Sequence, residues 1–188
     1  MVALRIASAL IAFASMGPAQ DVPPLPPLRG DAASLKDTMK FIEDKLPGTV
    51  HYEVYVHDNT TGKDRTFSRM FQLTNVTADP GRCSITFHSF FDNGSGEKAE
   101  HKDSEVKLKP VETVTFQQMD QVLQQGLAKQ GRPEISVKVE PAIFLVVLAW
   151  EPERRVMFNF YEDTLADRVS KAMQHAVELC GGGNKEPF

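Results

Sequence analysis

The spacing of apolar residues changes from a helical to a strand period near the start of the folded part of the chain. The first apolar residues of this part recur at intervals of four, three and four: Leu35, Met39, Ile42 and Leu46. These intervals place them on one face of a helix, and Ser34 and Pro47 are typical of its start and its end. From Val50 onward apolar and polar residues alternate, which is the period of a strand with one buried face. The pattern predicts an amino-terminal helix followed by strands.

Four alternating segments, separated by turn sequences, predict a series of antiparallel strands. They cover approximately residues 50–57, 65–76, 83–91 and 98–109. Asn93-Gly94, between the third and the fourth, favours the hairpin turn whose twist matches that of the strands. The fourth segment is highly charged as far as Val106, as is common in an edge strand.

The second half of the chain contains a continuous apolar run and the clearest helix. Residues 143–150 are apolar throughout and predict a central strand buried on both faces. Alternating segments at 135–139 and 156–160 predict two more strands. Residues 165–180 carry an apolar stripe opposite a polar one, which predicts a long amphipathic helix that ends at Gly181–Gly183.

One stretch, residues 111–130, fits both periods. Its first residues alternate, whereas Phe116 and Met119 follow a helical spacing, and we expect a short helix near 117–125. Together the elements predict one α+β domain over residues 34–181. We expect an antiparallel β-sheet or partial barrel of about seven strands, with the amino-terminal helix and the long carboxy-terminal helix packed on it.

This order of elements resembles the layout of pleckstrin-homology-like domains, in which several antiparallel strands precede one long helix. The resemblance covers about residues 50–181. More narrowly, residues 166–182, ADRVSKAMQHAVELCGG, are similar to the ending of some uncharacterised secreted bacterial proteins. The resemblance implies a fold but no activity, so it assigns no functional residue.

Residues 1–19 have the three-part layout of a secretory signal peptide. Arg5 precedes an apolar stretch at 6–16, and Gly17 and Ala19 suit the −3 and −1 positions of a cleavage site. A transmembrane anchor is the alternative, but a span needs roughly 20 apolar residues. We therefore expect an exported protein, periplasmic or extracellular, with no transmembrane segment in the mature chain.

Residues 20–33 are predicted to form a proline-rich spacer, and 182–188 a short tail. The spacer also matches a proline-rich ligand pattern at 24–29. With 41% hydrophobic and 24% charged residues among 188, the composition is that of an ordinary globular protein. The formal charge of −4 becomes −5 without Arg5, which offers nucleic acid little attraction. We predict no nucleic-acid partner and no cofactor.

Two cysteines, Cys83 and Cys180, permit a single intramolecular pairing in an oxidising compartment. Both lie on predicted apolar faces, so a disulfide would tie the sheet to the last helix; two buried free thiols are the alternative. A catalytic thiolate is disfavoured. His88 points to the opposite strand face from Cys83, and His175 lies about 140° around the helix from Cys180.

The histidines form no local catalytic or metal site. His51 and His57 share a strand face with Glu53 and Tyr55, but six residues of strand span about 20 Å, so one ion cannot bind both histidines. Ser95 lacks the G-x-S-x-G context of a nucleophile elbow. A solvated polar face is the simpler interpretation, and we predict no catalytic and no metal-binding residue.

Three basic residues around the first predicted hairpin, Lys63, Arg65 and Arg69, are the candidate ligand-binding residues. They suit a small anion or an anionic headgroup, with solvated turn residues as the alternative. The leading hypothesis is an exported, non-enzymatic binding or interaction module whose partner is a protein or a small anionic ligand.

Two other functions stay open. The first is a small exported enzyme of hydrolase type, whose site assembles from distant residues such as His51, His57, His88 or Glu53. The second is an envelope structural component that self-associates through an exposed sheet edge.

Overall fold

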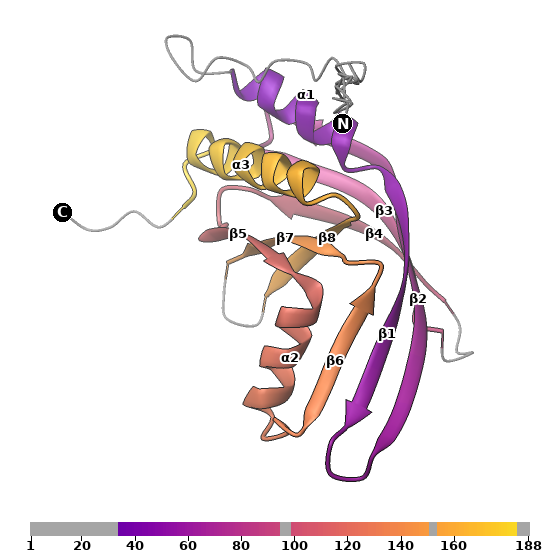
Figure 1. Ribbon diagram of the computed structural model, residues 1–188. Coiled ribbons are helices and arrows are strands. Elements are labelled where there is room, and N and C mark those ends of the chain that lie inside the picture. The colour runs from indigo at the N-terminus through magenta and orange to yellow at the C-terminus, as the bar shows by residue number, and fades with distance from the viewer. Residues whose placement is uncertain (1–33, 95–98, 151–153, 184–188) are drawn as a thin grey trace, which may run out of the picture. The chain divides into compact units, whose positions relative to one another are not determined.

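A computed structural model describes residues 34–94, 99–150 and 154–183 and shows an α+β fold (Figure 1). The described helices are α1 (Leu35–Lys45), α2 (Met119–Lys129) and α3 (Asp163–Leu179). The described strands are β1 (Gly48–Asp58), β2 (Lys63–Asp79), β3 (Ser84–Asp92), β4 (Glu100–Lys107), β5 (Thr113–Gln118), β6 (Ile135–Glu140), β7 (Phe144–Ala149) and β8 (Arg155–Phe160). The predicted leader (1–19), the predicted spacer (20–33) and residues 184–188 of the tail lie outside the described residues.

Helix α1 begins and ends where the sequence predicts. The Ser34 side chain accepts a hydrogen bond from the Asp37 backbone N–H at 3.2 Å, and its hydroxyl donates to the Asp37 carboxylate at 2.6 Å. The first of these bonds gives a partner to a backbone N–H that has none within the first turn of the helix. Met39 and Ile42 are completely buried, as their helical spacing predicts.

Five strands form one antiparallel sheet in the order β4-β3-β2-β1-β6. β1 and β2 make a long hairpin, paired from Gly48 opposite Leu73 to Asp58 opposite Lys63. We call the face that carries the buried Val50, Tyr52, Ile85 and Phe87 the inner face of this sheet, and the opposite face the outer face. Among the described strands β4 pairs only with β3, which confirms the predicted edge strand.

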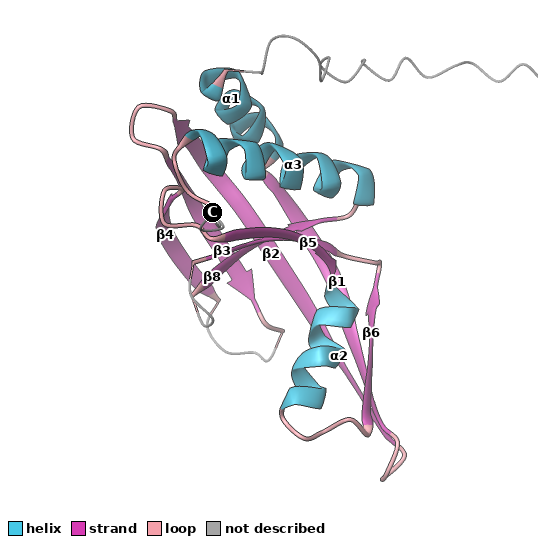
Figure 2. Cartoon of the chain, turned by 90° about the vertical axis from the view of Figure 1, so that its left-hand side faces the viewer, coloured by secondary structure: helices cyan, strands magenta, loops and turns pink. Residues whose placement is uncertain are grey.

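The other three strands form a second sheet in the order β5-β7-β8. Figures 1 and 2 show α3 on one side of this sheet and α2 on the other. On the α3 side, Val146 and Leu148 join a large core with α1, α3 and β2–β4; on the other side, Leu145 and Val147 join a smaller core with Val50 of β1. β7 is therefore buried on both faces, as its continuous apolar sequence predicts.

The α+β fold and its antiparallel strands are confirmed, and the strand count and the bounds of α2 differ in detail from the prediction. The chain has eight described strands instead of about seven, because residues 113–118 pair with β7 as β5, and α2 occupies 119–129 instead of 117–125. Phe116 therefore belongs to a strand, where its ring stacks on Phe144 at 5.9 Å between centroids. The described strands divide into two sheets and do not close into a barrel, so the sheet and not the partial barrel is the outcome.

The disulfide predicted from the two cysteines is confirmed. The Sγ atoms of Cys83 and Cys180 are 2.15 Å apart, and the bond joins the start of β3 to the end of α3. Backbone hydrogen bonds hold the same region. The Gly183 N–H donates to the Val111 carbonyl at 2.8 Å, and the Leu108 N–H donates to the Cys83 carbonyl at 2.9 Å.

Candidate anion-binding face

The three predicted ligand-binding residues lie on one face of one strand. Lys63, Arg65 and Arg69 are separated by even numbers of residues along β2, and Phe67 lies between the two arginines, so all four belong to the inner face. Their partners on β1 are Asp58, Val56, Val54 and Tyr52. Exposure decreases inward from the hairpin turn: Lys63 and Arg65 are exposed, and Phe67 and Arg69 are half-buried. We call Lys63, Arg65, Phe67 and Arg69, together with Val54 and Val56, the basic face.

Arg69 is the least solvated cation of the basic face. Its guanidinium carbon lies 5.2 Å from the centroid of the Phe67 ring, a cation–π contact. Its Nη1 atom is buried and has no hydrogen-bond partner among the described residues. Burial raises the pKa of the neighbouring Tyr52 phenol, and the positive charge of Arg69 partly opposes that shift. The Arg69 guanidinium thus lies beside apolar groups that exclude water.

No described carboxylate neutralises this face. Lys63, Arg65 and Arg69 form none of the ion pairs found among the described residues, whereas Lys40 and Lys138 are each paired with an acid. The nearest acid by register is Asp58, opposite Lys63, and its Oδ1 accepts the backbone N–H groups of Thr60 and Thr61 in the turn.

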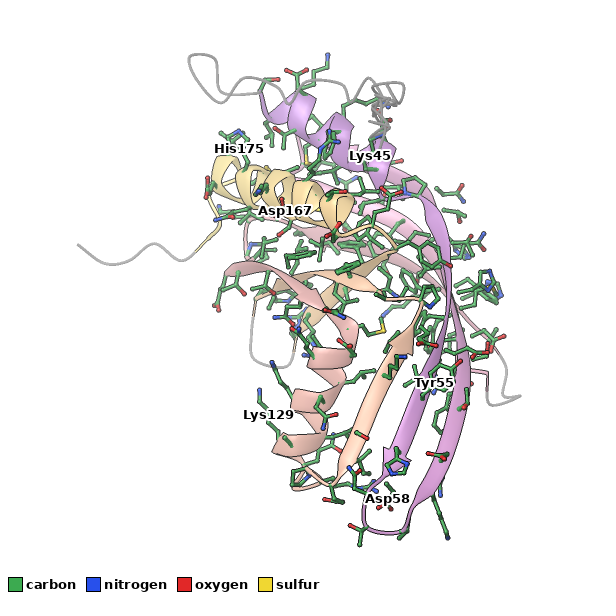
Figure 3. All side chains as sticks on the ribbon, viewed as in Figure 1. Lys45, Tyr55, Asp58, Lys129, Asp167 and His175 are labelled. Atoms are coloured by element: carbon green, nitrogen blue, oxygen red, sulfur yellow. A yellow bond between two sulfur atoms is a disulfide. The ribbon has the colours of Figure 1, made fainter. Side chains whose placement is uncertain are left out.

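Those turn contacts keep Asp58 ionised. Hydrogen bonds from Thr61, and then the backbone N–H of Thr60, hold the pKa of its carboxyl below the ordinary value. The carboxylate therefore serves the turn of the hairpin, next to which it lies in Figure 3. Among the described residues the three cations have no comparable partner.

Apolar side chains flank the three cations. Val54 and Val56 of β1 are half-buried, and Val137 of β6 lies beside Val56 on the same face. Val54 and Val137 also pack against the smaller core. Helix α2 packs against β6 and β5, and the inner face of the β1–β2 hairpin near its turn stays half-buried or exposed.

The histidines named in the enzyme hypothesis lie on the outer face, on two strands. His51 and His57 are on β1, and His88 is on β3, where its Nδ1 lies 2.8 Å from an Asp103 carboxylate oxygen. His57 Nδ1 pairs separately with Asp64 at 2.7 Å.

One shallow groove of about 190 Å³ includes His57 but none of the other residues named in the enzyme hypothesis. Glu53 instead accepts a hydrogen bond from the Tyr55 hydroxyl. Among the described residues no three His, Cys, Asp or Glu side chains are arranged to hold a metal ion. Ser95 lies outside the described residues.

His101, on β4, was not singled out from the sequence. Its Nδ1 lies 3.4 Å from His88 Nε2, and its ring meets Phe90 edge to face. The cross-strand register that brings these residues together depends on the β3–β4 hairpin, and Asn93-Gly94 was the only local signal for it. The structure therefore places His101 beside His88, on an open face of the sheet.

Two open strand edges are covered by side chains. The Gln124 amide donates to the Ile135 carbonyl at 2.7 Å and accepts the Val137 N–H at 3.0 Å, along the edge of β6 that faces away from β1. The Tyr161 hydroxyl donates to the His51 carbonyl at 3.0 Å and accepts the His51 N–H at 2.6 Å. Such bonds occupy groups that another strand would otherwise use, so they disfavour edge-to-edge self-association at these two places.

The fold and this face together define the class: an α+β domain with two antiparallel sheets and an unneutralised basic sheet face. Comparison with family models, curated proteins and solved structures finds no match. The resemblance to pleckstrin-homology-like domains stays a prediction. Among the described residues, none of the helices has the length and hydropathy of a membrane span.

Proposed function

We propose that this protein is an exported, non-enzymatic binding module whose ligand is anionic and binds on the basic face. The observation that carries the proposal is the set of three basic side chains on one strand face with no carboxylate partner among the described residues. Arginine favours this role because its planar guanidinium binds carboxylate or phosphate through two parallel hydrogen bonds.

The partial desolvation of Arg69 strengthens the expected attraction. A cation and an anion attract more strongly where apolar groups exclude water than they do in bulk solvent. Arg69 already has one buried nitrogen without a hydrogen-bond partner among the described residues. Its remaining N–H groups are the natural contacts for an oxyanion.

Export is supported by two observations of different kinds. The first 19 residues have the pattern of a secretory leader. The Cys83–Cys180 disulfide suits an oxidising compartment, since disulfides are rare in the reducing cytosol. A fusion of residues 1–25 to a reporter active only outside the cytoplasm tests this part, and export unchanged after Leu10→Arg would contradict it.

Binding is tested by calorimetric titration of the mature chain with inorganic pyrophosphate and with octyl phosphate. We expect dissociation constants on the order of 1 mM or lower. The triple variant K63Q/R65Q/R69Q should bind at least tenfold more weakly. The matched control K36Q/K45Q/K129Q removes the same charge from exposed lysines elsewhere and should bind like the wild type.

Two results would overturn the proposal. The first is that neither anion binds the wild type. The second is that the two triple variants lose affinity equally, because net charge alone would then explain the binding. Circular dichroism of each variant checks that both still fold.

A further inference from the structure

We infer that the ligand of the basic face is a single-chain amphiphilic anion, with its headgroup on Arg65 and Arg69 and its alkyl chain along Val54, Val56 and Phe67. The inference rests on the proposed function and adds the chemical class of the ligand. It is carried by the alternation of cationic and apolar side chains on the same strand face.

The expected position of the headgroup follows from the direction of the Arg69 side chain. Arg65 and Arg69 are four residues apart along β2, about 13 Å between their Cα atoms. Phe67 lies between them, and the Arg69 guanidinium lies over the Phe67 ring. The Arg69 side chain is therefore directed along the strand toward Phe67 and Arg65, and we place the headgroup between the two arginines.

The chain position follows from the apolar residues beside the headgroup. Phe67 is directly opposite Val54, and Arg65 is directly opposite Val56, so the valines and the ring form one apolar strip on neighbouring strands. All three are half-buried, which leaves part of their surface in water. Covering such surface with methylene groups is favourable, by an amount that grows with the area covered.

The strip leads toward the interior of the protein. Val54 packs against the smaller core, which also contains Tyr52 and Val139. A ligand with charge alone would leave this apolar surface in water, and a ligand with no charge would leave the three cations without a partner. An amphiphilic anion complements both.

The experiment is a chain-length series of inorganic phosphate and butyl, hexyl and octyl phosphate, each kept below its micelle-forming concentration. We expect the affinity to rise about two- to fourfold for each added methylene, since a fully buried methylene gives about fourfold. Phe67→Ser should flatten this dependence on chain length, because it removes the ring along which the alkyl chain is expected to lie. The control Phe90→Ser alters a half-buried ring on the outer face and should leave the series unchanged.

The failures of the two proposals are distinguishable. If pyrophosphate and octyl phosphate bind equally well and the K63Q/R65Q/R69Q variant binds neither, the proposed function stands and the amphiphile is wrong. If no anion binds, both are wrong. Binding to phosphatidylglycerol vesicles without binding of monomeric octyl phosphate, or tighter binding of a soluble glutamate-rich peptide, would also overturn the inference.

Discussion

Removing the disulfide is expected to lower the free energy of unfolding by several kcal/mol and to leave the fold intact. The bond joins residues 97 positions apart. The chain-entropy model gives about 4.7 kcal/mol for closing a loop of this size in the unfolded chain. Single domains are stable by about 5–15 kcal/mol, so the bond contributes a large share of the total.

The backbone at Cys83 reduces the expected loss. Its φ of 49° lies in the left-handed region, which costs a residue with a Cβ about 1–2 kcal/mol. Once the bond is removed, the backbone relaxes part of this strain, so we expect the Cys83→Ala/Cys180→Ala variant to lose about 3–4 kcal/mol and to keep the rest of the strain. Cys83→Gly/Cys180→Ala should be more stable than this alanine variant by about 1 kcal/mol, because glycine tolerates positive φ.

The assay is urea unfolding of the mature chain and of both variants, followed by far-ultraviolet circular dichroism. The dependence on urea should steepen in the variants, because an unlinked unfolded chain exposes more surface. Equal midpoints for the wild type and the alanine variant would refute the reasoning. So would an unreduced wild-type mass that already equals that of the free dithiol.

Three further predictions concern contacts between elements. The Glu43 carboxylate accepts the Ala78 N–H at 2.9 Å, and this bond, followed by the contact with Lys40, lowers the pKa of Glu43 below its ordinary value. The free energy of unfolding should therefore decrease as the pH falls through the lowered pKa. Acid-denaturation curves should show a smaller decrease for Glu43→Gln. Gln124→Ala should speed hydrogen exchange of the Val137 amide measured by NMR, whereas replacing the exposed Gln125 should not. Gly182→Ala should lower the free energy of unfolding in urea by about 1–3 kcal/mol, because its Cβ would lie 2.7 Å from a backbone carbonyl oxygen. The control Gly126→Ala on α2 places its Cβ more than 4 Å from any neighbour and should be neutral or stabilising.

The elements with a strong local period were predictable from the sequence. The apolar stripe of α3 and the apolar run of β7 are both buried in the structure, so the local pattern and the final packing agree. The boundary between β5 and α2 was not predictable in this way. Residues 113–116 are β-branched or aromatic and pair with β7, about 30 positions later in the chain, whereas Met119 begins a helix on the same sequence stretch. Pairing with the distant strand β7 decides between the strand and the helical period, and the local spacing carries no information about that pairing.

The division into two sheets has the same origin. β6 pairs with β1, and β7 with β5, although β6 and β7 are neighbours in sequence. At the candidate site, the common face of Lys63, Arg65 and Arg69 follows from their alternation along one strand. The cation–π contact with Phe67 and the burial near Tyr52 do not, because they depend on how the side chains pack between the strands and the smaller core.

The negative net charge of the chain conceals a positive face, and the two-residue period of the strand is the reason. Asp64 lies between Lys63 and Arg65 in the sequence, yet its side chain points to the outer face and pairs with His57. The outer face of the same strands also carries Glu53. Charged residues that are neighbours in the sequence of a strand thus lie on opposite faces, with the thickness of the sheet between them. An anion approaching the inner face meets the cations first, even though the formal charge of the whole chain is −4. A shift of β2 by one residue would exchange the two sets, so the anion selectivity proposed here depends on the register of the β1–β2 hairpin as much as on the basic residues themselves.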